Sequence, residues 1–260
     1  MTDDDRTADE TGADENGADE TGADETGADE NGADETGADE IAAGGFAAWL
    51  ADIDAALRGE RDAVVPCGRC TACCRSSQFV HIGPDEADTL RHVPLALRFP
   101  APRLPRGHVL LGYDDHGRCP MLVDDRCSIY EHRPRACRTY DCRVFAAAGL
   151  DAADDGKVLV ARQARRWRFE VESDDDLRHE AAVRAAAGFL RGHPSASPDG
   201  VTPTTTTQLA VLAVEARGAF IELDVATGEA SVVAHPNVQA VRVELTRRRP
   251  TPGAPGRPSR

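Results

Sequence analysis

Eight cysteines, all between Cys67 and Cys142, constrain the fold of this 260-residue chain more than any other feature. In a reducing compartment a disulfide framework is not maintained, and crowded thiols are typical of metal sites. Cysteines packed as small hydrophobic residues would explain one or two of them, not eight at these spacings. We therefore expect all eight to be metal ligands: Cys67, Cys70, Cys73, Cys74, Cys119, Cys127, Cys137 and Cys142.

The first cluster runs from Cys67 to Cys74, with three cysteines at a spacing of three residues and the fourth directly after them. A loop with this spacing can turn several thiolates toward one point, as ferredoxin-type loops do around an iron–sulfur cluster. Gly68 helps the backbone turn tightly.

The second cluster, from Cys119 to Cys142, has wider gaps of seven, nine and four residues after the Cys119-Pro120 pair. Two groups of four thiolates would fill two tetrahedral sites, and thiolates suit both zinc and iron–sulfur chemistry. Ligands can equally be shared between the clusters. The spacing leaves open both the metal, zinc or an iron–sulfur cluster, and the pairing.

Four thiolates around a zinc ion or a cubane cluster carry a net charge of about −2, which nearby cations should offset. Eight arginines lie within four residues of a cysteine: Arg69, Arg75, Arg118, Arg126, Arg133, Arg135, Arg138 and Arg143. Arginine is also the general cation of this chain, in which Lys157 is the single lysine. Proximity in sequence therefore does not show whether these arginines offset the charge of a metal site or are simply the usual cations of this chain.

At these residues the sequence resembles the YkgJ-like cysteine-cluster family, also described as the CxxCxxCC zinc- or iron-chelating domain. The resemblance rests on the motif Cys67 to Cys74, on Cys119-Pro120 and on the motif CSIYEHRPRACRTYDC from Cys127 to Cys142. It covers roughly residues 61 to 145. It implies a small domain whose cysteines bind zinc or iron. Some flagellin lysine N-methylases have a similar cysteine arrangement, which implies an enzymatic alternative, but no glycine-rich loop for a nucleotide-like cofactor follows a strand here.

The net charge of −15 is concentrated at one end of the chain. Residues 1–40 contain 17 Asp and Glu against one Arg, in a TGADE or NGADE repeat without any large aliphatic residue before Ile41, and we expect a disordered tail. The other residues are close to neutral, which argues against a halophile-type surface and against a nucleic-acid partner. We find no secretory signal and no apolar run of membrane length, and expect a cytoplasmic protein that makes no membrane contact.

The remaining segments predict an α+β fold with an irregular, helix-rich and metal-stabilised cysteine domain. An amphipathic helix is expected over 41–60, the cysteine domain over 61–150 with a helix starting at Pro84, and an extended loop from Pro94 to Arg106. A helix is expected after Cys142, at 144–150. The C-terminal region, 151–246, predicts α+β structure: helices at 175–192 and 204–216, a mixed helix or strand at 157–172, and a hairpin around Thr227-Gly228. Residues 247–260 read as a basic, proline-rich disordered tail.

Other side chains near the cysteines are interpreted mainly as structural. His81, His116 and His132 could replace a sulfur ligand, although eight thiolates suffice for two sites. Tyr130 and Tyr140 are expected to cover the metal from water, and Asp141 to cap or to pair with an arginine. The basic run from Arg162 to Arg168 is expected to form a solvated face.

Three hypotheses follow from the sequence. The first is a metal-stabilised binding module that handles metal, transfers electrons or recognises a protein partner. The second is an enzyme that uses an iron–sulfur cluster in protein modification. The third is a structural zinc domain that presents its tails to a partner protein.

Overall fold

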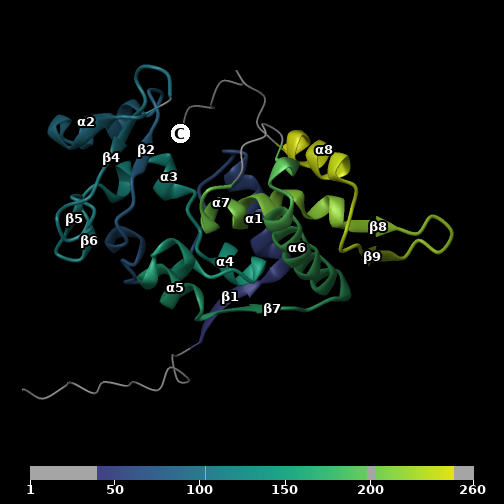
Figure 1. Cartoon of the computed structure of the whole chain (residues 1–260). Helices are drawn as coiled ribbons and strands as arrows, with labels where there is room; N and C mark the ends of the chain where they lie inside the picture. Colours follow the sequence, from purple (N-terminus) through teal and green to yellow (C-terminus); the bar gives the residue numbers. More distant parts are fainter. Residues whose placement is uncertain (1–39, 103, 198–202, 249–260) are drawn as a thin grey trace, which may run out of the picture. The chain divides into compact units, whose positions relative to one another are not determined.

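Two hydrophobic cores of unequal size organise the part of the chain that is described, residues 40–102, 104–197 and 203–248 of a computed structural model. The larger core draws its residues from Ala43 to Leu245, and the smaller consists of Ile82, Val93, Leu111 and Ile129. The mixture of helices and short strands confirms the predicted α+β class. Figure 1 shows the elements that surround the two cores.

The helices and strands are short except for α6. The α-helices are α1 (Phe46–Leu57), α2 (Ala87–His92), α3 (Arg135–Arg138), α4 (Arg143–Ala148), α5 (Val158–Ala164), α6 (Asp174–Gly192), α7 (Thr206–Ala216) and α8 (Val238–Arg248). The strands are β1 (Ile41–Gly45), β2 (Val80–Ile82), β3 (Arg98–Pro100), β4 (Val109–Leu111), β5 (Leu122–Val123), β6 (Arg126–Cys127), β7 (Trp167–Glu170), β8 (Ile221–Leu223) and β9 (Ala230–Val232). Short 3-10 turns include η2 (Cys73–Arg75), η4 (Tyr130–His132) and η7 (Arg217–Phe220).

The larger core lies among α1, α4, α6 and α7, which contact one another and gather in Figure 1. Both longer C-terminal helices begin at a side-chain cap: Ser173 accepts a hydrogen bond from the Asp176 amide, and Thr205 accepts one from Gln208. Alanines on the buried faces of α6 and α7 let the helices approach closely. The predicted helices at these positions are confirmed.

The first residues of the predicted 41–60 helix form a strand instead. β1 pairs with β7 in parallel, with Ile41 opposite Trp167, and the helix begins only at Phe46. Gly44 has a φ of +85° and Gly45 follows it, and two glycines make a helix costly at this point. The amphipathic pattern is correct for 46–57 alone, and this helix packs in the larger core with α6.

The smaller core is covered by a three-stranded antiparallel sheet in the order β2-β4-β3. The predicted helix after Pro84 is present as α2. The segment from Pro94 to Arg106 is not wholly an extended loop, because it contains a 3-10 turn and the strand β3. Pro100 is tolerated there because β3 is an edge strand, where a missing N–H costs no ladder hydrogen bond.

At the C-terminal end, β8 and β9 form the predicted hairpin, with Gly228 at a positive φ of 73°. The next helix, α8, extends to Arg248, so the first two residues of the predicted basic tail are helical. Buried Val241 and Leu245 hold α8 on the core, and the Arg248 side chain bonds to Glu244 and Asp54. The other residues of both predicted tails lie outside the described residues, apart from Glu40, which pairs with Arg168. None of the described helices has the length and apolar character needed to cross a membrane.

Candidate metal centre

The first cysteine cluster lies in the irregular segment between α1 and β2. The Cys70 amide donates to the Cys67 carbonyl at 2.9 Å, and this tight turn passes through Gly68 at a φ of +55°. Cys73 and Cys74 then open the turn η2, and their sulfurs lie 3.9 Å apart. Two sulfurs at tetrahedral corners around zinc are about 3.8 Å apart, since the Zn–S bond is about 2.3 Å. The adjacent pair therefore has a spacing that one metal ion can accept.

The second cluster is brought to the first by a backbone contact and a small hairpin. The Cys119 amide donates to the Cys74 carbonyl at 2.8 Å. Strands β5 and β6 then pair Leu122 with Cys127 around Asp124 and Asp125, both at positive φ, and Arg75 forms an ion pair with Asp125. The hairpin thus returns Cys127 toward Cys119 and is fixed to η2.

The last two cysteines are positioned by short helices. Cys137 lies in α3 and Cys142 immediately precedes α4. Cys142 is buried, and the indole N–H of Trp167 donates to its sulfur at 3.1 Å. All eight cysteines are free thiols in the structure.

Mutual effects on thiol pKa values show which cysteines are neighbours, because Coulomb interactions weaken with distance. Burial raises the pKa of Cys67 to about 11, and Cys70 and Cys73 contribute to this rise. Burial likewise raises the pKa of Cys142 to about 12, where Cys67 and Cys70 also act and the Trp167 hydrogen bond opposes them. Cys142 therefore lies with Cys67 and Cys70, not with the other cysteines of its own sequence cluster.

The other thiols form a second neighbourhood. Burial raises the pKa of Cys137 to about 12, with contributions from Cys73, Cys119 and Cys127. Burial also raises the pKa of Cys119, to which Cys127 and Cys73 contribute. Cys74 joins this group, because Cys119 and Cys137 both raise its pKa.

Cys73 stands between the two neighbourhoods. Its thiol affects both Cys67 and Cys137, and a hydrogen bond from Cys74 lowers the pKa of Cys73 to about 7. The same contact raises the pKa of Cys74, because that sulfur keeps the shared proton. Among the described residues, no group of three ligand atoms that all lie within 4.8 Å of one another includes a cysteine sulfur, so the thiols would have to draw closer around a bound metal.

Two of the eight predicted arginines act on the thiols electrostatically. Arg133 lowers the pKa of Cys73 and Cys137, and Arg143 lowers that of Cys67. The Arg133 guanidinium also lies over the Tyr130 ring, 3.6 Å from its centre. Three others make ion pairs with carboxylates: Arg75 with Asp125, Arg135 with Asp85 and Arg138 with Asp62.

A buried ion pair joins the cysteine segment to the larger core. Arg143 and Asp141 are 6% and 1% exposed, and their side chains meet at 2.8 Å. Asp141 thus pairs with an arginine as expected, and its carboxylate also accepts a hydrogen bond from the Trp49 indole at 2.9 Å. Arg143 donates to the carbonyls of Ala43 and Val64, so it holds both β1 and the chain just before Cys67.

The donor set fits a thiolate-bound metal, and one orphaned group supports the fit. The buried Tyr140 hydroxyl has no hydrogen-bond partner among the described residues. Burial raises its pKa, with contributions from Cys142 and Cys73, and the nearby Gln78 side chain opposes this rise, so the hydroxyl remains a donor. A sulfur that carries charge would accept this hydrogen bond. Tyr130, in contrast, is 56% exposed and does not cover the site, because it stacks with Arg133 at the surface.

Sequence reasoning missed Trp167, which was placed on a solvated face. The residue is 2% exposed, because β7 pairs with β1 and turns the indole into the larger core. The three histidines considered as substitute ligands have other neighbours: His81 bonds to His108, the His116 amide bonds to Asp114, and His132 bonds to Asp88. The sequence does contain a signal for the burial of Trp167. Trp167 and Phe169 alternate with polar residues at the end of the basic run, and this alternation predicts a strand with one buried face.

Comparison with known proteins gives one match. Residues 66–153 match the family model CxxCxxCC, described as "Putative zinc- or iron-chelating domain". No curated protein and no solved structure matches the chain. The matched segment contains all eight cysteines and ends within the α+β core, after α4. Residues 66–153, about a third of the chain, are therefore similar to the CxxCxxCC cysteine-cluster family, which supports the resemblance drawn from the sequence.

Proposed function

We propose that the eight cysteines hold zinc or an iron–sulfur cluster at two neighbouring sites, and that ligands cross between the two sequence clusters. Cys67, Cys70 and Cys142 form the first group, and Cys74, Cys119, Cys127 and Cys137 form the second. Cys73 lies where the two groups meet, because its sulfur is 3.9 Å from that of Cys74 and its thiol also raises the pKa of Cys67. The grouping is supported by the Cys67 and Cys70 thiols, which raise the pKa of Cys142, and by the Cys119 and Cys127 thiols, which raise that of Cys137; the hydrogen bond from the Cys119 amide to the Cys74 carbonyl also supports it.

The surroundings support a negatively charged site. A metal with four thiolates has a net charge of about −2, and Arg133 and Arg143 supply opposing charge beside it. The N–H group of Trp167 and the Tyr140 hydroxyl offer hydrogen bonds to sulfur, which tune affinity and redox potential. Bound zinc would crosslink the segment, whereas an iron–sulfur cluster would in addition carry electrons. A reducing compartment such as the cytoplasm would keep the thiols available for either.

The metal is identified by anaerobic purification, a visible spectrum and analysis of zinc, iron and labile sulfide. Brown protein with iron and sulfide supports an iron–sulfur site, and colourless protein with zinc supports a structural zinc domain. If the purified protein holds neither metal and all eight thiols react freely in the folded state, metal binding by these cysteines is wrong.

The grouping is tested with Cys142→Ser and Cys127→Ser, one residue from each group. We expect each variant to lose about half of the bound metal, because each removes one ligand set and leaves the other intact. Ser128→Ala is the matched control, since it changes an exposed side chain beside Cys127 and should retain full metal content. Complete metal loss in both cysteine variants would show one joint site instead of two.

A further inference from the structure

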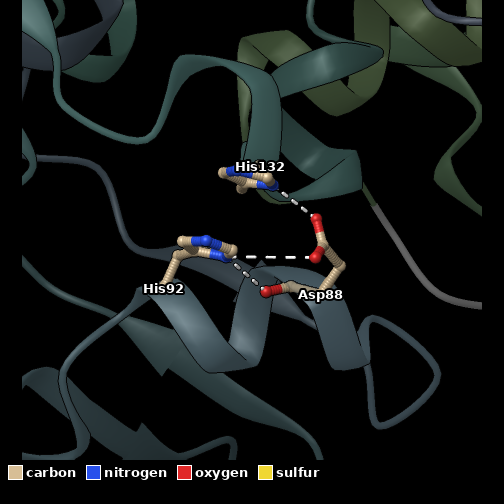
Figure 2. Close-up of side chains that lie close together, drawn as sticks. All are labelled: Asp88, His92 and His132. Atoms are coloured by element: carbon tan, nitrogen blue, oxygen red, sulfur yellow. Dashed lines mark hydrogen bonds and ion pairs between the residues drawn. The ribbon is translucent and has the colours of Figure 1, made fainter.

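Asp88, His92 and His132 bring one carboxylate and two imidazoles together outside the cysteine groups, as Figure 2 shows. His132 Nδ1 lies 2.6 Å from Asp88 Oδ2, and His92 Nδ1 lies 4.0 Å from Asp88 Oδ1. The two imidazole rings are stacked, with centres 3.5 Å apart and an angle of 2° between their planes. One ligand atom from each residue lies within 4.8 Å of the other two.

The fold positions these three side chains from two elements. Asp88 and His92 are four residues apart on α2 and so lie on the same helix face, and His132 comes from η4. The two elements are fixed against each other on both sides of the cluster. The buried Glu86 carboxylate accepts hydrogen bonds from the amides of Gly83 and Arg135, and the Thr89 hydroxyl donates to the Arg133 carbonyl at 3.3 Å.

The donor spacing suits a small divalent ion. Zinc–nitrogen and zinc–oxygen bonds are about 2.0–2.2 Å, so tetrahedral donors lie roughly 3.3 Å apart. The separations of 2.6 and 4.0 Å bracket this value, and only the side-chain torsions have to adjust. The stacked rings must turn apart for both nitrogens to face one ion. Imidazole and carboxylate together favour zinc and similar transition metals over calcium or magnesium.

A second Asp and His pair shows what such a pair does without a third donor. Asp175 and His179 are also four residues apart on a helix, and their side chains approach to 3.3 Å. The His179 Nδ1 contacts the Asp175 carbonyl at 2.9 Å, as His92 contacts the Asp88 carbonyl at 2.9 Å. The helix pair alone is thus an ordinary surface contact. The feature that distinguishes the first cluster is His132, which comes from the loop between Cys127 and Cys137.

We propose that Asp88, His92 and His132 form a separate, solvent-accessible site for a divalent transition metal of the zinc type. Their side chains are 53%, 39% and 39% exposed, so water can fill the remaining coordination positions. Such a site exchanges its ion readily, unlike a closed site with four thiolates. The inference does not depend on the cysteine sites, and its ligands include none of the cysteines.

The site is tested with full-length protein that keeps the metal it carries on purification. Zinc chloride is added while the imidazole nitrogens are followed by NMR and binding is measured by calorimetry. We expect one additional zinc equivalent, with resonance changes confined to His92 and His132. His92→Ala and His132→Ala should each weaken this binding by about tenfold or more, whereas His179→Ala, the matched control, should leave it unchanged.

The cysteine metal is counted separately in every variant. The histidine substitutions should leave the purified metal content and the circular dichroism spectrum as in the wild type, because these side chains are exposed. A wild-type protein that takes up no additional zinc would overturn the proposal, and so would equal additional binding by all three histidine variants. Loss of the purified metal in His92→Ala or His132→Ala would show that these histidines are not separate from the cysteine sites and would also overturn the proposal, whereas a wild-type protein that purifies without cysteine metal but binds the additional zinc would count only against the proposed function.

Discussion

At the scale of single residues, the buried position of Trp167 brings its indole within hydrogen-bonding distance of the Cys142 sulfur. The indole lies in the larger core, and its N–H group donates to the Cys142 sulfur at 3.1 Å. This hydrogen bond opposes the rise in pKa that burial causes at Cys142. A sulfur that is more easily deprotonated is a better metal ligand.

Trp167→Phe should weaken metal binding at the first cysteine group by about 10- to 100-fold, because an outer hydrogen bond to a ligand is lost while the ring remains. Zinc affinity is measured by competition with a chromogenic chelator. Phe169→Leu, a change on the same strand and against the same core without a donor to sulfur, is the packing control. Equal zinc affinity in the wild type and Trp167→Phe would show that the Trp167 N–H group does not affect the metal ligands.

At the scale of elements, Asp54 forms ion pairs that connect α1, η7 and α8. It lies on α1 and bonds to Arg217 of η7 and to Arg248 of α8 at 2.9 and 3.0 Å. Burial raises the pKa of Asp54, but the hydrogen bond and charge of Arg217 and those of Arg248 outweigh it and hold the pKa below its usual range. The folded state therefore binds fewer protons at Asp54 than the unfolded state.

Asp54→Asn should lower the free energy of unfolding by roughly 3 kcal/mol at pH 7, because two arginines lose a partly buried partner. A depressed pKa in the folded state stabilises above the unfolded pKa, about 3.9, and this stabilisation is lost as the pH falls through the folded pKa. The difference between wild type and variant should therefore shrink when urea denaturation is repeated at pH 3.

Asp52→Asn is the matched control on the same helix, since Asp52 pairs with Arg61 at the surface and a pair of this kind contributes about 1 kcal/mol or less. If Asp54→Asn is no more destabilising than Asp52→Asn, the contact between the three elements has little energetic weight.

The elements that could be predicted from sequence are those with a local signal. The α6 and α7 helices have caps and periodic apolar residues, and the β8–β9 hairpin has its Gly228 turn. The strand β1 could not be recognised, because it is formed through pairing with β7, more than 120 residues away. The cysteine motif is a local pattern and can be recognised in the sequence. The position of Cys142 near Cys67 depends on how distant segments fold together, so the sequence alone does not predict it.

At the scale of the whole molecule, the two cores differ greatly in what they can stabilise. The smaller core has four buried residues, each contributing about 2 kcal/mol, whereas ordering each residue of the cysteine segment costs roughly 1–2 kcal/mol. The smaller core therefore depends more on crosslinks than the larger one, which contains the buried faces of α1, α4, α6 and α7.

Removal of the metal with a chelator under reducing conditions should therefore unfold the cysteine segment and leave the larger core folded, since metal-binding energy is folding energy for the segment alone. Hydrogen exchange should show lost protection in β2 and β4 and retained protection in α6 and α7. Restoring the metal should restore protection. Simultaneous loss of protection in both regions would show that the molecule unfolds as one unit.

The packing of α4 shows where a fragment of this chain could be cut without exposing apolar surface. The family match ends at residue 153, yet Val144, Phe145, Ala147 and Ala148 of α4 are buried against α6 and α7, beyond that boundary. A gene fragment that stops at the boundary would encode a protein with an uncovered apolar helix face. In this chain the matched segment is therefore not a self-sufficient module, because α6 and α7 are needed to cover α4.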